Sequence, residues 1–401
     1  MPANPKVQNP KTESSPDDPP MRLLKPACRA TLTLALVCGA AAGQKLDFNG
    51  QASGWLTLNR DTSYQVQTGV RYIPNLSTAL PPYLDGELSV NGFVSAQARS
   101  LDSLDTDRMA KPYRAWARFS TARLEARAGL QKINFGSATL LRPLQWFDRI
   151  DPHDPLGLTD GVYGLLGRCY FQNNANLWAW SLIGNSSPKG WEQIGSERWT
   201  PEFGGRAQLS VPRGEIAATY HHRTVDYSQV QKNYVLLDEQ DEDRLGVDAK
   251  ADIGIGLWLE GILSRTTHNL IDGEEGQPVW TRAAVVGADY TLGVGNGVGL
   301  LAEHMVAGGA AQPFGRGTDA QVSALMLSYP LSLLDNIRGF VYFDWKNQDL
   351  YRFVGWERTL DSWVFSAAVF WNPDRPQGLT GQPNSGAAGG KGLQLMVAFN
   401  H

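Results

Sequence analysis

The feature of this sequence that most limits its fold is an alternation of apolar and polar residues with a period of two. In residues 244–252 (RLGVDAKAD), Leu245 and Val247 fall on one side, whereas the charged Arg244 and Asp248 fall on the other. The same alternation recurs at 88–94, 123–130, 206–211, 215–223, 337–346 and 392–399. Such alternation is typical of β-strands with one apolar and one polar face. The sequence therefore predicts an all-β fold.

The connections between the predicted strands are sorted by length. Connections after even-numbered strands are mostly short, such as 212–213, and those after odd-numbered strands are mostly long, such as 133–161. This asymmetry is typical of a transmembrane antiparallel up-and-down β-barrel, with tight turns at one end and long loops at the other. Four connections break the rule: 75–82 and 329–335 are long, and 60–63 and 347–348 are short. We therefore expect about 18 strands, within a range of 16–18. The predicted strands are 45–59, 64–74, 83–100, 111–120, 122–132, 162–172, 176–185, 203–211, 214–224, 243–252, 255–267, 279–292, 297–307, 318–329, 336–346, 349–358, 361–371 and 391–400.

Composition and charge exclude several other classes of protein. The chain carries 13 Trp, 13 Tyr and 14 Phe, which argues against intrinsic disorder. No apolar run of about 20 residues occurs after residue 43, so a helical membrane protein is excluded. A net charge of −4 without a basic block argues against nucleic acid as a partner. No metal-ligand spacing or phosphate-binding loop is seen, and no cofactor is expected.

Tryptophans near strand ends are expected to form aromatic girdles; they are Trp55, Trp178, Trp180, Trp345, Trp363 and Trp371.

The N-terminal region is predicted to be a targeting segment. Residues 1–20 are interpreted as a disordered leader or as a misassigned start before Met21. Residues 21–42 have a basic start, an apolar stretch and a small-residue end at Ala40–Ala42, which is typical of a signal peptide. The barrel is then expected to span residues 43–401. It retains one cysteine, Cys169, so an internal disulfide is excluded.

A hydrolase is the enzymatic alternative, because some outer-membrane barrels cleave lipids with a serine and a histidine. The candidate bases within strands are His221, His222 and His304. No spacing singles out a nucleophile, and Gly-x-Ser-x-Gly is absent from the sequence. The sequence therefore favours a protein that is not an enzyme.

One segment carries a family resemblance. Residues 129–136 (GLQKINFG), Arg142-Pro143, Trp146-Phe147-Asp148 and Asp151-Pro152 resemble a hallmark segment of porin-like Gram-negative outer-membrane barrels, a set that includes alginate-export-type barrels. The resemblance implies an aqueous channel in the cell outer membrane, in contact with membrane lipids and lipopolysaccharide. It also implies that the barrel-assembly machinery recognises the last strand. A homo-oligomer is a further expectation from the resemblance. Here Asn400-His401 follow Phe399, where the family ends on an aromatic residue.

The resemblance further implies that connection 133–161 folds into the lumen and forms a constriction. The implied constriction residues are Arg142, Trp146, Asp148, Arg149, Asp151, His153, Asp154 and Asp160. The alternative is an exposed loop in which Arg–Asp pairs hold the shape.

The polar faces of the predicted strands carry more cations than acids. The cations are Arg114, Arg118, Arg123, Arg127, Arg206, Arg223, Arg244, Lys250, Arg338 and Lys346. The acids are Glu125, Glu215, Asp248, Asp252, Glu260 and Asp344. This excess predicts a lumen with a mild anion preference that falls with salt. The alternative is that neighbouring arginines and carboxylates pair across strands.

These observations together favour a porin-like channel for passive or weakly anion-selective diffusion of small hydrophilic solutes. A dedicated transporter for a saccharide or another anionic polymer is the second hypothesis, and a closed structural or adhesive barrel is the third. The solute, the oligomeric state and the course of 133–161 stay open at this point.

Overall fold

A computed structural model shows an antiparallel β-sheet of eighteen strands. It describes residues 45–60, 64–80, 82–100, 103–151, 153–228, 239–267, 279–315, 317–373 and 390–401. The leader predicted for 1–20 and the signal peptide predicted for 21–42 lie outside these residues and stay predictions. The strands are β1 (Lys45–Arg60), β2 (Tyr64–Leu80), β3 (Leu84–Ser100), β4 (Ser103–Ser120), β5 (Leu124–Gln131), β6 (Val162–Tyr170), β7 (Asn176–Leu182), β8 (Glu202–Val211), β9 (Gly214–Asp226), β10 (Glu239–Asp252), β11 (Gly256–Thr266), β12 (Val279–Leu292), β13 (Val298–Ala310), β14 (Thr318–Pro330), β15 (Asp335–Asp344), β16 (Asp349–Leu360), β17 (Trp363–Trp371) and β18 (Lys391–Asn400).

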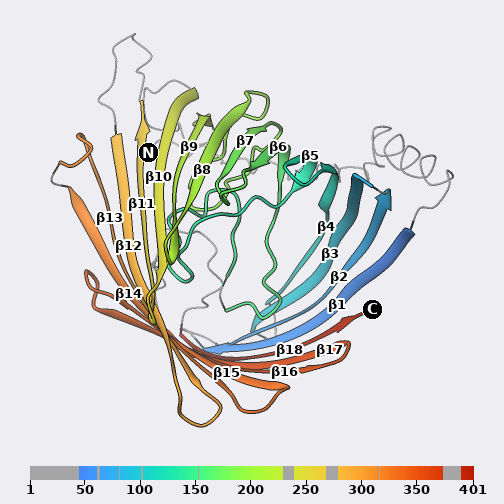
Figure 1. Cartoon of the computed structure of the whole chain (residues 1–401). Coiled ribbons are helices and arrows are strands. Elements are labelled where there is room, and N and C mark those ends of the chain that lie inside the picture. The colour runs from blue at the N-terminus through green and yellow to red at the C-terminus, as the bar shows by residue number, and fades with distance from the viewer. Residues whose placement is uncertain are drawn as a thin grey trace, which may run out of the picture. The chain divides into compact units, whose positions relative to one another are not determined.

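The sheet closes into a barrel. Each strand pairs with its sequence neighbours, and β1 pairs both with β2 and with β18. Figure 1 shows the strands around an interior that is crossed by a segment of chain between β5 and β6. Closure gives every strand a partner on both sides over part of its length, although only Ala115–Ser120 of β4 pair with β5. The predicted all-β barrel is confirmed.

Helices play no part in the wall. Among the described residues, none lies in a helix long and apolar enough to cross a membrane.

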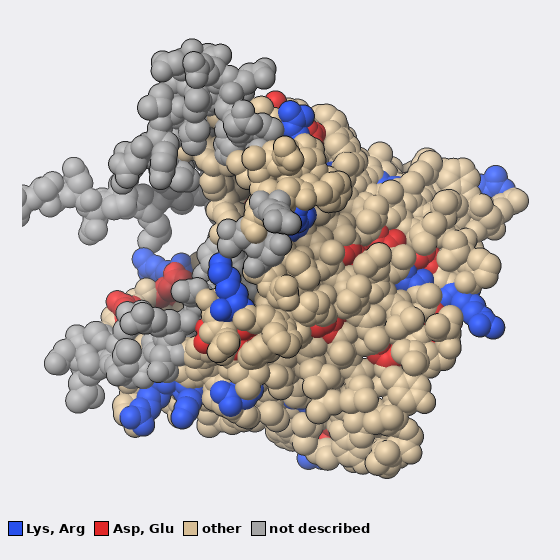
Figure 2. All heavy atoms as spheres, turned by 90° about the vertical axis from the view of Figure 1, so that its left-hand side faces the viewer, with Lys and Arg blue, Asp and Glu red and all other residues tan. Residues whose placement is uncertain are grey.

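The inner and outer faces follow the alternation in the sequence. On β10, Leu245 and Val247 are 55% and 54% exposed on the outer face, whereas Arg244 and Asp248 are buried on the inner face. The outer face over the strands at the left of Figure 1 consists mainly of uncharged residues (Figure 2). An apolar outer belt on a closed barrel is the arrangement that a lipid bilayer requires.

Three strands extend at least four residues beyond their predicted bounds. β2 continues to Leu80 because Asn75 resumes pairing with Ser89 of β3 beyond Pro74, which interrupts the ladder without ending the strand. β4 begins at Ser103 rather than 111, and a register shift between Ser89 and Val90 of β3 accommodates Pro112 of β4. Proline is tolerated within strands at such irregularities. β10 starts at Glu239 rather than 243.

These extensions change the connections as well. The connection after β2 shrinks to 81–83 and the one after β14 to 331–334, so both now fit the rule of short connections after even-numbered strands. The connections 61–63 and 345–348 stay short although they follow odd-numbered strands. We call the end of the barrel with the connections after even-numbered strands the turn end, and the opposite end the loop end.

The tryptophans divide between the two faces. Trp345 and Trp363 are about half exposed on the outer face, as an aromatic girdle requires. Trp180 is buried inside, and Trp55 and Trp178 also face the interior, where they contact Arg71 and Arg168 respectively. The prediction of an aromatic girdle was therefore wrong for Trp55, Trp178 and Trp180. Their positions in the alternation of their strands place them on the inner face.

The chain ends within the sheet. Backbone hydrogen bonds of 3.0 Å join Gly50 to His401 in both directions, so pairing with β1 continues past Asn400. His401 lies two residues after Phe399 and stacks against it and against Tyr72 on the outer face. The imidazole thus occupies the next outward aromatic position of the last strand.

Candidate functional site

The segment between β5 and β6, residues 132–161, lies inside the barrel and contacts the inner face of distant strands. We call it the first inner segment. The amide of Ala138 donates to Glu260 of β11 at 2.6 Å, and the amide of Thr139 donates to Glu303 of β13 at 2.7 Å. The His153 ring packs against Phe340 of β15 and Phe353 of β16. The segment therefore crosses the interior from β5 to the opposite wall (Figure 1).

Two wall carboxylates hold the backbone of this segment. Glu303 accepts the amides of Thr139, Leu140 and Leu141 at 2.5–3.0 Å, and it also accepts the Trp258 indole at 3.0 Å. The carboxylate of Glu260 accepts the amides of Ala138 and Leu144. Buried backbone donors need acceptors, and a charged acceptor makes the stronger bond. These two carboxylates therefore act as anchors for a segment with no regular secondary structure.

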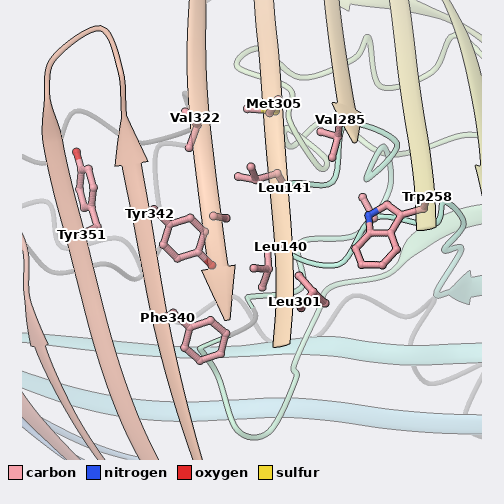
Figure 3. Close-up of a cluster of buried hydrophobic side chains, with 12 residues drawn as sticks. Leu140, Leu141, Trp258, Val285, Leu301, Met305, Val322, Phe340, Tyr342 and Tyr351 are labelled. Carbon is pink, nitrogen blue, oxygen red and sulfur yellow. The ribbon is translucent and has the colours of Figure 1, made fainter. Parts of the chain in front are cut away.

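Apolar packing reinforces the anchors. Leu140 and Leu141 lie against inner-face side chains of neighbouring strands, including Leu301, Met305 and Val322 (Figure 3). A second cluster on the other side of the interior packs Phe135, Leu144, Trp146 and Phe147 of the segment against Trp180 and Leu182 of β7, with Ile133, Val162 and Leu166. Packing against the first inner segment therefore removes this part of the inner wall from contact with water.

Glycine permits the closest approach between segment and wall. Gly136 has φ +101°, and a Cβ there would overlap a carboxylate oxygen of Glu260. A side chain at this position would both strain the backbone and displace the anchor.

Three of the predicted constriction residues are buried and hold the shape of the segment. Arg142 contacts Asp148 at 3.5 Å and donates to Asn134 at 2.6 Å, and both ionic side chains are at most 10% exposed. Burial raises the pKa of Asp148, although Arg142 opposes the shift. Trp146 is 2% exposed and packs edge-on against Phe135. These three residues were predicted to lie at or near the narrowest point of the passage, and the structure buries their side chains within the segment.

A second connection, residues 183–201 between β7 and β8, also lies against the inner wall. We call it the second inner segment. Arg149 of the first segment donates to the carbonyls of Gly190 and Glu192, and the Trp191 indole donates to the carbonyl of Arg142 at 2.6 Å. These hydrogen bonds thus hold the two inner segments in place against each other.

Ion pairs fix the second inner segment to the wall. The fully buried Glu192 contacts Lys189 at 3.4 Å and both Arg223 of β9 and Arg244 of β10 at 3.1 Å. Both arginines also pair with Glu242. Charges withdrawn from water are retained only when paired in this way.

Several of the wall cations predicted to face the lumen are therefore not available to a solute. Arg206 forms a two-pronged pair with Asp248 at 2.5 and 2.9 Å, and its side chain is 3% exposed. Arg223 and Arg244 are 4% and 7% exposed beneath the second inner segment. All three face inward as their parity predicts, yet partners and overlying chain cover them. The alternative of pairing across strands describes them correctly.

The remaining predicted wall cations differ in their surroundings. Arg114 is buried and donates to backbone carbonyls, including that of Thr159 at 2.9 Å. Arg338 lies 3.8 Å from Glu357 and is 40% exposed. Arg123 and Lys346 lie in turns, and Lys250 is exposed near the turn end of β10.

A group of arginines on β4–β6 stays partly open to the interior. Arg118, Arg127 and Arg168 lie 3.9, 3.2 and 3.4 Å from the single carboxylate of Glu125, and Arg118 also pairs with Asp85 at 2.8 Å. Their side chains are 33%, 15% and 17% exposed. Three guanidinium groups thus share two carboxylates, and we call these five residues the arginine cluster. Arg118 and Arg127 are two of the predicted wall cations, and Arg168, which was not predicted, joins them in this cluster.

The tip of the first inner segment borders a cavity of about 260 Å³. Asp151, His153 and Asp154 line it from the segment, and side chains of β1, β2 and β15–β18 line it from the wall. We call it the tip cavity. His153 hydrogen-bonds Asp151 at 2.7 Å; burial would raise the pKa of Asp151, but this contact outweighs burial and lowers it. Asp160 lies away from the cavity, where it pairs with Lys111 at 2.7 Å.

The strand histidines do not share one environment. His221 is fully buried between Trp180 and Glu202, and His222 contacts Asp243 at 2.9 Å. The His304 ring lies 2.9 Å from the hydroxyl of Ser323 on the outer face, and the Trp345 indole donates to the same hydroxyl. Side chains able to hold a metal do not gather in the described part of the chain.

Comparison with known structures identifies the architecture. The outer membrane protein opdK from Pseudomonas aeruginosa aligns with a TM-score of 0.53 at 11% identity, over 89% of this chain and 98% of that one. Pseudomonas aeruginosa OccK2 (OpdF), solved in complex with glucuronate, gives 0.55 at 11% identity over 89% and 98%. Acinetobacter baumannii OccAB1 gives 0.53 at 10% identity over 90% and 98%. The chain has the fold of an outer-membrane porin.

At 10–11% sequence identity, the likeness to these structures shows the fold. No protein-family model and no curated protein matches the sequence. The shared features are those of backbone architecture, namely the closed barrel and its connections.

Sequence reasoning missed several residues that shape the interior of this porin fold. Glu303, Glu192 and Lys189 were not singled out, and Arg71 and Trp55 were not assigned to a cavity. One signal was available: β11–β15 carry apolar residues at inward positions, such as Leu301 and Met305. A wall facing water would be polar there, so this pattern indicates that chain covers it.

Proposed function

We propose that this protein is an outer-membrane channel for the passive diffusion of small hydrophilic solutes. The observation that carries the proposal is the first inner segment, anchored across the interior to Glu260 and Glu303 while the tip cavity stays open beside it. A segment held rigidly inside a barrel narrows the passage and limits the size of the solutes that pass. Selectivity then depends on the charges that line what stays open.

We further propose a weak preference for anions. In the arginine cluster three guanidinium groups face two carboxylates, and the side chain of Arg118 is one third exposed. The net positive charge attracts small anions over a distance of about 8–10 Å at physiological salt. The preference is therefore expected to be strongest in dilute salt.

Conductance across a planar bilayer tests both proposals. The refolded protein is expected to give stable openings, with a reversal potential in a KCl gradient that indicates excess chloride permeability. Arg118→Gln combined with Arg168→Gln removes two charges of the cluster and is expected to abolish the anion preference. Arg358→Gln, at an outer-face arginine that is 44% exposed, is the matched control and should leave selectivity unchanged. Absence of conductance from a folded barrel would contradict the channel and favour a closed structural barrel.

Asp154 is expected to make the selectivity depend on pH. Burial raises the pKa of Asp154 above its ordinary value, in spite of the hydrogen bonds from the amides of Leu156 and Leu158. As the pH falls, this carboxylate therefore takes up its proton before an ordinary aspartate does, and the passage loses a negative charge. Chloride preference should rise on acidification through this step. Asp154→Asn should show the high preference at neutral pH and lose the step, whereas the exposed Asp160→Asn should keep it. An unchanged step in Asp154→Asn would refute the assignment.

The surroundings of the channel follow from the same proposal. The apolar outer belt suits membrane lipids, and the loop end is proposed to face lipopolysaccharide at the cell surface while the turn end faces the periplasm. The amphipathic last strand, with His401 in an outward aromatic position, is proposed to be read by the barrel-assembly machinery. A homo-oligomer and kinship with alginate-export-type barrels are proposals that rest on the resemblance of segment 129–152.

A further inference from the structure

The tip cavity combines aromatic surfaces with hydrogen-bonding groups that lack partners. Its volume of about 260 Å³ leaves room for a single six-membered ring rather than for a folded polymer. It lies between the tip of the first inner segment and β1, β2 and β15–β18, away from the arginine cluster on β4–β6. A solute that passes the tip of the first inner segment on this side contacts the walls of the cavity.

Two of the aromatic rings lie flat on the wall. A Cβ at Gly69 of β2 would overlap the six-membered ring of Trp55, and a Cβ at Gly392 of β18 would overlap the ring of Phe370. Each ring therefore lies over a glycine of the neighbouring strand, where no side chain intervenes. A ring held flat against a sheet presents its opposite side to the interior. Both rings line the tip cavity.

Arg71 supplies one donor that has no acceptor in the described part of the chain. Its guanidinium group lies over the rings of Trp55 and Phe93, at 5.4 and 5.6 Å from their centroids. Its Nε is buried and has no hydrogen-bond partner among the residues that the structure describes. A buried donor without an acceptor is unfavourable, and an oxygen of a bound molecule or of water would satisfy it.

The first inner segment supplies acceptors to the cavity. The carboxylate of Asp154 accepts the amides of Leu156 and Leu158 at 2.9 and 3.1 Å, one on each oxygen, so each oxygen retains a further lone pair. The amide side chains of Gln67 and Gln394 also line the cavity. A molecule in the cavity meets both a cation from the wall and a carboxylate from the segment. This pairing favours a ligand with many hydroxyl groups and no net charge, because an anion would be repelled by Asp154.

We propose that the tip cavity is a binding subsite for a neutral sugar ring, stacked on Trp55 and Phe370 and hydrogen-bonded between Arg71 and Asp154. The inference rests on the proposed channel, and it adds a solute class and a location. Apolar faces of sugar rings pack on aromatic side chains, while their hydroxyl groups both donate and accept. The subsite would slow the passage of sugars relative to ions and so hold them beside the tip of the first inner segment.

Two measurements on the refolded protein test the subsite. In a planar bilayer, glucose is expected to reduce the ion current in a saturable manner, and glucuronate, which differs by one carboxylate, to reduce it less. Titration calorimetry in detergent should give the same order of affinity without requiring conductance. Trp55→Leu and Phe370→Leu should each weaken glucose binding roughly tenfold, a loss typical of removing an aromatic stacking partner. Trp55→Phe keeps a ring and should lose less. Trp345→Leu, on the outer face, is the matched control.

The outcomes separate this inference from the proposed function. Normal conductance with no saturable effect of glucose and no calorimetric binding would overturn the subsite and leave the channel intact. Stronger binding of glucuronate than of glucose would overturn the assignment to a neutral ligand. Calorimetric binding that Trp55→Leu and Phe370→Leu each weaken supports the subsite even in a barrel without conductance, an outcome that would refute only the channel.

Discussion

Glu303→Ala is expected to raise the single-channel conductance severalfold. The substitution leaves three backbone amides of the first inner segment and the Trp258 indole without their acceptor. Each unsatisfied buried donor costs about 1–3 kcal/mol, so the anchored position loses much of its advantage over positions in which water reaches the segment. The segment should then leave the wall of β13 and widen the passage. Single-channel recording in a planar bilayer measures the change directly.

Two further variants make this result specific. Glu303→Gln keeps one carbonyl oxygen of the same shape and should show an intermediate conductance. Glu215→Ala removes another inner-face carboxylate, which lies on β9 and accepts a hydrogen bond from Gln208 at 2.6 Å, so it should leave the conductance unchanged. Equal conductance in Glu303→Ala and the unsubstituted protein would mean that apolar packing of Leu140 and Leu141 alone holds the segment.

Arg206→Ala is expected to lower the free energy of unfolding by about 3–5 kcal/mol, because it leaves Asp248 buried without its cation. Arg206 makes two hydrogen bonds to this carboxylate, a third to Thr219 at 3.0 Å, and lies over the ring of Phe135. Urea unfolding of the barrel refolded in lipid vesicles, followed by tryptophan fluorescence, measures the loss. The effect should be one of the largest for a single wall residue.

Arg338→Ala is the matched substitution for this prediction. It removes the same side chain from the inner face, but its partner Glu357 lies 3.8 Å away and the arginine is 40% exposed. Such a pair contributes about 0–1 kcal/mol. The double substitution Arg206→Met with Asp248→Leu should recover much of the stability, since buried ion pairs can often be replaced by apolar residues. Equal losses in Arg206→Ala and Arg338→Ala would show that burial does not govern the contribution of these cations.

The barrel could be predicted because its determinants are local. Alternation within β10 already separates Leu245 from Arg244, and short connections such as Pro212-Arg213 join strands that must pair as neighbours. The predicted bounds were furthest from the structure at β2 and β4. Pairing there continues past Pro74 through an interruption and past Pro112 through a register shift.

The content of the lumen could not be predicted because it depends on contacts between distant residues. Ala138 and Glu260 are 122 positions apart, and Thr139 and Glu303 are 164 apart. Parity assigned Arg206 to the inner face correctly. Whether an inner-face cation meets water or a carboxylate depends on the neighbouring strands and on the chain that covers them.

The sequence by itself determined the closed barrel and the direction in which each strand side chain points, because both follow from a period of two and from the lengths of the connections. Only the tertiary structure decided which inner positions are dry, which arginines are neutralised and where the open cavity lies. The physical reason is that inward-facing groups compete for one enclosed volume. Glu260, Glu303 and Glu192 are satisfied there by backbone amides and guanidinium groups from other parts of the chain, and Arg71 keeps an unpaired donor at the tip cavity.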